Sequence, residues 1–178
     1  MADVSVRPAR PEDAERVARV QLSTWRTAYA DLLPPEALDV PEVQAAALWL
    51  GAVESPPSPR HRLLVAMERD ELVGVAASGP VSADDGLDDG VTAELMTLLV
   101  EPRWGRRGHG SLLVAATVEP WRGDGFETAV AWAWERDPAT RSFLLGSGWE
   151  PDGAVRGLDT GPRVQQQLRF PTDLREAP

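Results

Sequence analysis

The sequence predicts an α/β (α+β) fold, because segments with helical and with strand periodicity alternate along its 178 residues. Apolar residues at steps of three and four indicate the helices, and alternation or short apolar runs between turn residues indicate the strands. A third observation is the stretch 98–114, where an apolar strand, a turn rich in arginine and glycine, and an apolar helix follow one another. The predicted order of elements is β-α-α-β-β-β-α-β-α-β-β.

The N-terminal part is predicted to hold one short strand and two helices. Residues 4–7 alternate, and Pro11-Glu12-Asp13 supplies the proline and acids that are typical of a first helical turn. The apolar stripe of this helix reaches about residue 30, and Pro34-Pro35 stops it. Pro41-Glu42 opens a second, shorter helix. The stripe consists of Ala14, Val17, Ala18, Leu22, Trp25 and Tyr29.

The middle and last parts are predicted to be mainly strands. Residues 61–68 and 71–78 have the pattern of a β-hairpin, with Gly74 as a candidate bulge, and 83–90 form an acidic loop. The loop is interpreted as either a solvated turn or a lip that attracts a cation. Residues 128–135 alternate between alanines and larger side chains, Asp137-Pro138 caps a helix, and 155–159 and 164–170 contain the last strands. Trp132, Trp134 and Trp149 are predicted to lie in the core.

The stretch 98–114 predicts an anion site. Residues 91–100 read as a strand buried on both faces, which Pro102 ends. Glycines then let the backbone turn sharply and approach a ligand, and a helix follows from Ser111 onward. Backbone N–H groups at the start of that helix would bind a diphosphate. The turn contains three glycines and three arginines, Gly105, Gly108, Gly110, Arg103, Arg106 and Arg107.

Two nucleotide-binding motifs do not fit this turn. The chain has no lysine, which a nucleotide P-loop requires, and the glycine spacing G-x-x-G-x-G reverses that of the dinucleotide fingerprint. The turn instead resembles the pyrophosphate loop of the GNAT acetyltransferase superfamily, Gln/Arg-x-x-Gly-x-Gly/Ala between a strand and a helix. Gly108 and Gly110 match its two small positions. Gly105 departs from it, while Arg106 and Arg107 keep the positive charge.

Two other segments carry the same resemblance. Trp25-Arg-Thr-Ala-Tyr29 with Leu33-Pro34 is similar to the first helix of one bacterial subgroup, and residues 137–149 resemble the segment Asn-x-x-Ala-x-x-Phe-Tyr…Gly-Phe. The resemblance implies one domain over residues 1–171, with a frayed tail at 172–178. It also implies a mixed, mostly antiparallel sheet flanked by helices, and a homodimer is compatible with it.

The activity that the resemblance implies is transfer of an acetyl group from acetyl-CoA to an amine of a small molecule or peptide. Leu98 and Val100 would line the pantetheine arm. The side chain of His109 would contact phosphate in a pH-sensitive way, or would point to solvent while its backbone N–H binds. The other residues expected to bind the cosubstrate are Arg103, Arg106, Arg107, Gly108, Gly110, Ser111, Asp137 and Phe143.

Catalysis by direct attack needs a base for the amine and a proton for the thiolate that leaves. Glu94 is the candidate base, because it is the one acid on the strand that leads into the turn, where burial would raise its pKa. The alternative is that Glu94 is a solvated residue at the end of the strand. Leu144 occupies the family's tyrosine position, so the thiolate leaves without a dedicated acid, or Tyr29 substitutes for it. The alternative function is a CoA-binding sensor without turnover.

Composition excludes several other classes. The net charge of −10 argues against general nucleic-acid binding, and the chain lacks a run of about 20 apolar residues that would span a membrane. Without cysteine there is neither a disulfide nor a thiol nucleophile, and two histidines do not suggest a zinc site. Together with the resemblance, these exclusions lead us to expect a cytoplasmic, bacterial acetyltransferase without a metal. A dinucleotide-dependent oxidoreductase is a distant third interpretation.

Overall fold

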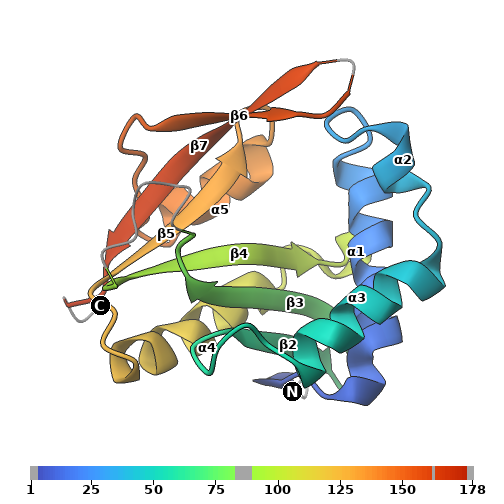
Figure 1. Cartoon of the computed structure of the whole chain (residues 1–178), viewed down its shortest axis with the longest axis horizontal. Coiled ribbons are helices and arrows are strands. Elements are labelled where there is room, and N and C mark those ends of the chain that lie inside the picture. Colours follow the sequence, from blue (N-terminus) through green and yellow to red (C-terminus); the bar gives the residue numbers. More distant parts are fainter. Residues whose placement is uncertain (1–3, 83–89, 162, 176–178) are drawn as a thin grey trace. The chain divides into compact units, whose positions relative to one another are not determined.

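The structure is a computed structural model that describes residues 4–82, 90–161 and 163–175 (Figure 1). Its seven strands form a sheet in the order β1-β2-β3-β4-β5-β7-β6. Strands β4 and β5 pair in parallel, whereas the pairs β1–β2, β2–β3, β5–β7 and β6–β7 are antiparallel. The mixed, mostly antiparallel sheet flanked by helices is therefore confirmed. The expected acidic loop lies, except for Gly90, outside the described residues.

The chain divides into two compact parts. The first part comprises residues up to Ser78 together with 97–117, and the second comprises 79–96 together with 118 onward. The first contains β1 (Val4–Pro8), η1 (Pro11–Asp13), α1 (Ala14–Ala28), α2 (Pro35–Leu38), α3 (Glu42–Glu54), β2 (Arg62–Glu68), most of β3 (Glu71–Pro80), the end of β4 (Thr92–Val100), η3 (Pro102–Trp104) and the start of α4 (His109–Gly123). The second contains the remaining pieces of β3, β4 and α4, with β5 (Thr128–Trp134), α5 (Pro138–Gly146), β6 (Val155–Asp159) and β7 (Val164–Asp173).

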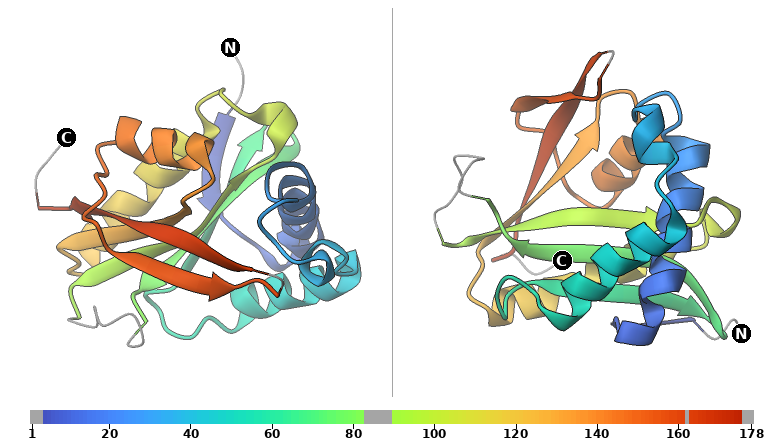
Figure 2. Two further views of the ribbon diagram at one scale, coloured as in Figure 1. Left: turned by 90° about the horizontal axis from the view of Figure 1, so that it is seen from above. Right: turned by 45° about the vertical axis from the view of Figure 1, so that its right-hand side comes forward.

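Helix α1 lies beside α3 in the first part, and Ala18 and Leu22 of its predicted apolar stripe form the contact (Figure 2). Val17 and Val20 of the same helix pack on β2 and β3 in the main hydrophobic cluster of this part. The sequence interpretation missed α2, a single turn that begins at Pro35. Pro34-Pro35 does stop α1, but proline has the φ angle of a first helical turn, so the second of the two prolines also starts a new helix.

Asp13 anchors the start of α1 and is buried. Its carboxylate accepts two hydrogen bonds from Arg7 on β1, at 2.6 and 2.9 Å, and one from the backbone N–H of Arg10 at 2.8 Å. The bond from Arg7, and to a smaller extent that from Arg10, holds the pKa of Asp13 below its usual value against the effect of burial. The folded state therefore favours the ionised carboxylate, which stabilises the protein above pH about 4.

We expect Asp13→Asn to lower the free energy of unfolding by about 2 kcal/mol at pH 7, since hydrogen bonds to a charged group are lost. The difference from the wild type should shrink as the pH falls through the depressed pKa of Asp13, where the wild-type carboxyl group is protonated too. Urea unfolding at several pH values measures this. Glu12→Gln is the control, because the side chain of Glu12 is 68% exposed. Equal midpoints for the wild type and Asp13→Asn at pH 7 would contradict the role given to Asp13.

The predicted hairpin is present as β2 and β3, joined by Arg69-Asp70 with Arg69 in the left-handed region (φ 54°). Val73 is the extra residue of the bulge, because Ala66 faces Gly74 while the next residue on β2, Met67, faces Leu72. Gly74 is needed for a close approach. A Cβ there would lie 3.0 Å from the carbonyl oxygen of Leu99, so β4 can pass tightly beside β3.

The second part is built on β5, whose alanines are buried as predicted, and α5 lies against this strand (Figure 2). The prediction that Trp132 and Trp134 are core residues is wrong, because both are only half-buried. Arg156 and Arg169 lie 4.3 and 5.9 Å from the ring centroid of Trp132, so charged side chains share its face. The core tryptophans of this part are Trp121 and Trp149, which contact each other at 6.3 Å between ring centroids.

The structure differs from the predictions for the C-terminal tail and for the burial of strand β4. Strand β7 extends to Asp173, and Leu174 is buried with its N–H donating to the carbonyl of Glu127. Residues 172–174 are thus held by the sheet, and the frayed tail was predicted too early. Strand β4 is buried on both faces only in its first half, because Met96 is 44% exposed. The assignment of residues 1–171 to one domain stays a prediction.

Candidate active site

The turn between β4 and α4 gives the chain a cluster of backbone donors. Gly108 adopts a left-handed conformation (φ 88°), and the first helical bond runs from the N–H of Leu112 to its carbonyl. Helix α4 thus begins at His109, two residues before the predicted start at Ser111. The N–H groups of His109, Gly110 and Ser111 precede the helical hydrogen-bond ladder, and together they form the positive end of the helix dipole.

The three arginines of the turn have different surroundings. Arg103 is ion-paired with Glu101 at 2.7 Å. Arg107 stacks on Trp104, 4.8 Å from its ring centroid, and lies 3.4 Å from Glu68 on β2. Arg106 is exposed and in the left-handed region, with φ 63°. The sequence predicted that all three bind the cosubstrate, whereas the structure pairs Arg103 and Arg107 with neighbouring acids.

His109 does not point to solvent, and this expectation is wrong. Its imidazole is buried, with Nε2 2.8 Å from Oε2 of Glu68. That is an ion-pair distance, although Nε2 does not meet the geometry of a well-formed hydrogen bond. The side chain also gives no surface to a phosphate, so only the backbone N–H of His109 is available for the anion.

Glu68 is a residue that sequence reasoning missed. It contacts Arg107 and His109, the two residues that flank Gly108, and half-buried Trp104 joins them with an edge-to-face contact to His109 at 6.3 Å. We call Glu68, Trp104, Arg107 and His109 the Glu68 cluster. Nothing in the local sequence reveals it, because Glu68 ends a strand far from the turn along the chain. The cluster fixes the backbone on both sides of Gly108.

Glu94 lies on β4 in the second part and is buried, with 7% of its surface exposed. It is paired in register with Val130 of β5. The Nη2 atom of Arg156 on β6 lies 4.0 Å from its Oε1 atom. The sequence predicted Glu94 as an isolated acid beside apolar residues, so this neighbouring positive charge was missed. The position of Arg156 beside Glu94 depends on the pairing of β6 with β7, which local patterns do not determine.

The remaining predicted residues lie as follows. Tyr29 ends α1 and packs half-buried against the hydrophobic cluster of the first part. Asp137 caps α5, and its carboxylate accepts bonds from the backbone and hydroxyl of Thr140. Leu144 is buried, and Phe143, Leu98 and Val100 are half-buried. Their roles toward a cosubstrate stay predictions.

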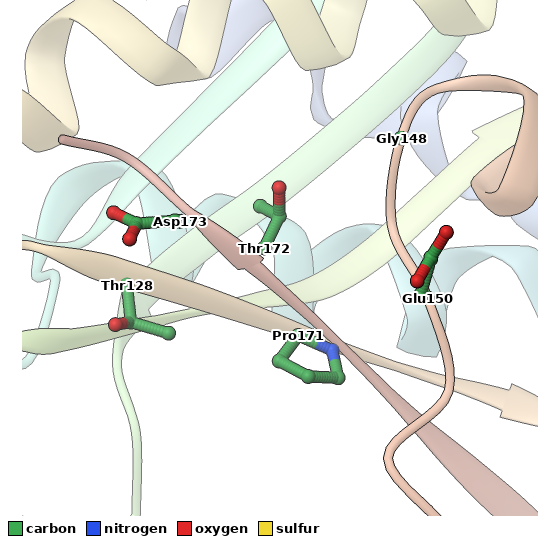
Figure 3. Close-up of a pocket in the computed structure, with 6 residues that line it drawn as sticks. All are labelled: Thr128, Gly148, Glu150, Pro171, Thr172 and Asp173. Carbon is green, nitrogen blue, oxygen red and sulfur yellow. The ribbon is translucent and has the colours of Figure 1, made fainter. Parts of the chain in front are cut away.

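A hollow of about 390 Å³ in the second part is a different kind of site (Figure 3). Residues of β5, β7 and the segment after α5 line it, among them Glu150 and Asp173. Hydrogen bonds from the side chain and backbone of Arg175 lower the pKa of Asp173 to about 2. Because Asp173 is already an ionised partner of that arginine, we assign it no catalytic role.

In the ranges 4–82, 90–161 and 163–175, no three histidines or acids lie close enough together to hold a metal ion. No helix in these ranges is both long and apolar enough to cross a membrane.

A mixed sheet and a glycine-rich turn before a helix are typical of α/β proteins that bind phosphate groups at a helix N-terminus. The sequence model of the acetyltransferase (GNAT) family matches residues 22–146. The chain therefore belongs to the GNAT family and is an N-acetyltransferase.

Individual relatives agree with this assignment. The chain is 27% identical over 152 residues to YuaI, an uncharacterized N-acetyltransferase of Bacillus subtilis. The matched region covers 84% of this chain and 80% of YuaI. A Desulfovibrio desulfuricans structure assigned to the GNAT family is 25% identical, with a TM-score of 0.71 over 96% of this chain and 99% of that one. PaiA N-acetyltransferase of Thermoplasma acidophilum, solved with coenzyme A, shares the fold at 16% identity, with a TM-score of 0.73 over 94% and 98%.

Proposed function

We propose that this protein transfers an acetyl group from acetyl-CoA to the amine of a small molecule or peptide, by direct attack in a ternary complex. The observation that carries the proposal is the left-handed Gly108 followed by three N–H groups that precede the ladder of α4. Such a helix start binds phosphate oxygens. Gly108 to Ser111 would hold the diphosphate of CoA, with Arg103, Arg106 and Arg107 adding positive charge, and Leu98 and Val100 would line the pantetheine arm.

Glu94 is the base in this proposal. It would take the proton from the amine, directly or through water, while the nitrogen lone pair forms a bond to the thioester carbonyl carbon. The carbon–sulfur bond then breaks, and the electron pair leaves with the thiolate. Support comes from the place of Glu94, a buried acid on the strand that runs into the diphosphate turn.

The thiolate would leave without a dedicated acid. Leu144, at the family's tyrosine position, has no proton to give and is buried. A thiolate is a good leaving group and can take its proton from water. The absence of cysteine in the chain favours direct attack over a thioester on the enzyme. We further propose that the enzyme works in the bacterial cytoplasm.

Two measurements on the wild type test the proposal. Calorimetric titration with CoA and acetyl-CoA should give micromolar binding, and free thiol should be released when an amine panel is added. Binding without thiol release from any amine would favour the alternative, a CoA-binding sensor. Absence of CoA binding would overturn both.

We expect Glu68→Ala to weaken CoA binding about five- to tenfold, because Arg107 and His109 lose the carboxylate that fixes the turn on both sides of Gly108. Isothermal calorimetry measures the effect. Glu71→Ala is the matched control, since Glu71 faces Glu68 in the hairpin register and is exposed. Tighter CoA binding in Glu68→Ala would contradict this role, because it is the result expected if Glu68 were only a negative charge near the diphosphate.

A further inference from the structure

One face of the second part brings together polar side chains from four strands. Glu94 of β4 pairs with Val130, and Trp132, two residues further along β5, lies on the same face. Arg169 of β7 faces Trp132, and Arg156 of β6 faces Gln167 of β7. We call Glu94, Trp132, Arg156 and Gln167 the Arg156 cluster.

The guanidinium of Arg156 is held from three sides. Its Nε donates to Oε1 of Gln167 at 2.8 Å, its Cζ lies over the ring of Trp132 at 4.3 Å from the centroid, and its Nη2 is 4.0 Å from Oε1 of Glu94. Stacking on an aromatic ring and a hydrogen bond donated by Nε fix the orientation of an arginine that would otherwise be flexible. Its side chain nevertheless keeps 30% exposure, so a ligand can reach it.

The second arginine on this face differs in its charge balance. Arg169 lies 5.9 Å from the Trp132 ring and forms an ion pair with Asp152 at 2.7 Å, besides a hydrogen bond at 2.9 Å. Its charge is matched by a close carboxylate of its own. Arg156 lies 4.0 Å from Glu94, so two opposite charges stand side by side on this face.

We propose that the acceptor amine also carries a carboxylate within a few bonds, so that the substrate is an amino acid or a similar zwitterion. Arg156 would bind the carboxylate through its terminal nitrogens, and Glu94 would face the amino group that it deprotonates. Arginine is suited to this because its planar donors match the two carboxylate oxygens. The inference rests on the proposed function, and it assigns Arg156 as a specificity-determining residue.

The test compares amino acids with their carboxamides and with the corresponding decarboxylated amines. Thiol release is measured with each acceptor, and kcat/KM is expressed per concentration of unprotonated amine. The wild type should prefer the acid over its amide at least about tenfold. Arg156→Gln should lower kcat/KM about 10- to 100-fold more for the acid than for the amide, the usual cost of losing a charged hydrogen bond, and leave the KM for acetyl-CoA unchanged. Arg156→Lys should restore part of the preference.

The matched control is Arg175→Gln, which removes a guanidinium of the same part that pairs with Asp173 and Glu127 instead. It should keep the acid preference of the wild type. Equal loss for acid and amide in Arg156→Gln, or a wild type that prefers the amide, would overturn the inference.

Binding of the same compounds to the CoA complex, followed by calorimetry, gives a readout that does not need turnover. A preference for acids that disappears in Arg156→Gln supports the inference even if no thiol is released. In that case the failure belongs to the proposed transfer reaction. If the CoA complex binds acids and amides equally, the inference fails whatever the turnover.

Discussion

Gly108→Glu is expected to raise the dissociation constant of CoA at least about 100-fold. The φ angle of 88° at this position costs a non-glycine residue about 1–2 kcal/mol. A Cβ here would meet no atom within 4 Å, so a side chain can begin at this position without a clash. The carboxylate of the glutamate can then bind the first N–H groups of α4 as a capping residue does, and it competes with the diphosphate for the same donors.

Gly108→Ala separates the two effects. Alanine imposes the same backbone strain without the charge, so we expect it to weaken CoA binding only about five- to tenfold. Gly105→Ala is a second comparison, because Gly105 has an ordinary φ of −59° and a Cβ would lie 3.2 Å from the carbonyl oxygen of Pro102. Calorimetry with CoA measures all three variants, and circular dichroism checks that they are folded. CoA affinity in Gly108→Glu equal to that of the wild type would show that α4 does not hold the diphosphate.

Glu94→Gln should lower kcat about 10²- to 10³-fold at pH 7, which is the usual contribution of a general base. Glutamine has nearly the same volume, so the packing on β4 is kept, but it cannot accept the proton of the amine. The KM for acetyl-CoA should stay within a factor of two or so, because the diphosphate turn is untouched. Thiol release over a range of pH measures the effect, and the acidic limb that remains when kcat/KM is expressed per concentration of unprotonated amine should disappear.

Glu150→Gln is the control for Glu94. It removes the same group from the polar hollow of Figure 3, to which no catalytic role is assigned, and it should leave kcat unchanged. Turnover of Glu94→Gln equal to that of the wild type at pH 7 would refute the assignment of the base. Loss of activity in both variants would instead indicate that the second part as a whole is sensitive to charge.

Much of the fold is predictable because its signals are local. Pro11-Glu12-Asp13 marks the start of the first helix, Arg69-Asp70 the hairpin turn and Asp137-Pro138 the cap of α5, and each lies where the structure has it. These residues act on the backbone within one turn of themselves, so their effect can be read without knowing the rest of the chain. The same holds for the glycines before α4.

The predictions that failed concern side chains whose surroundings come from distant segments. Trp132 and Trp134 were predicted to be buried from their alternation, yet the face they share holds Arg156 and Arg169 of other strands. His109 was predicted to point to solvent or phosphate, but its side chain is buried and lies beside Glu68 of the hairpin. Alternation tells which residues share a face, but it does not tell what covers that face.

The sequence by itself therefore determined the order of the strands and longer helices, the family, and the turn that offers backbone donors, since these depend on local pattern and spacing. Only the tertiary structure decided that Glu68 contacts both neighbours of Gly108, which are Arg107 and His109, and that Arg156 lies beside Glu94. The physical reason is that both pairs join residues far apart in the chain, and the pairing register of the strands sets their distances. A shift of one residue in either register would turn these charges to the opposite face of the sheet.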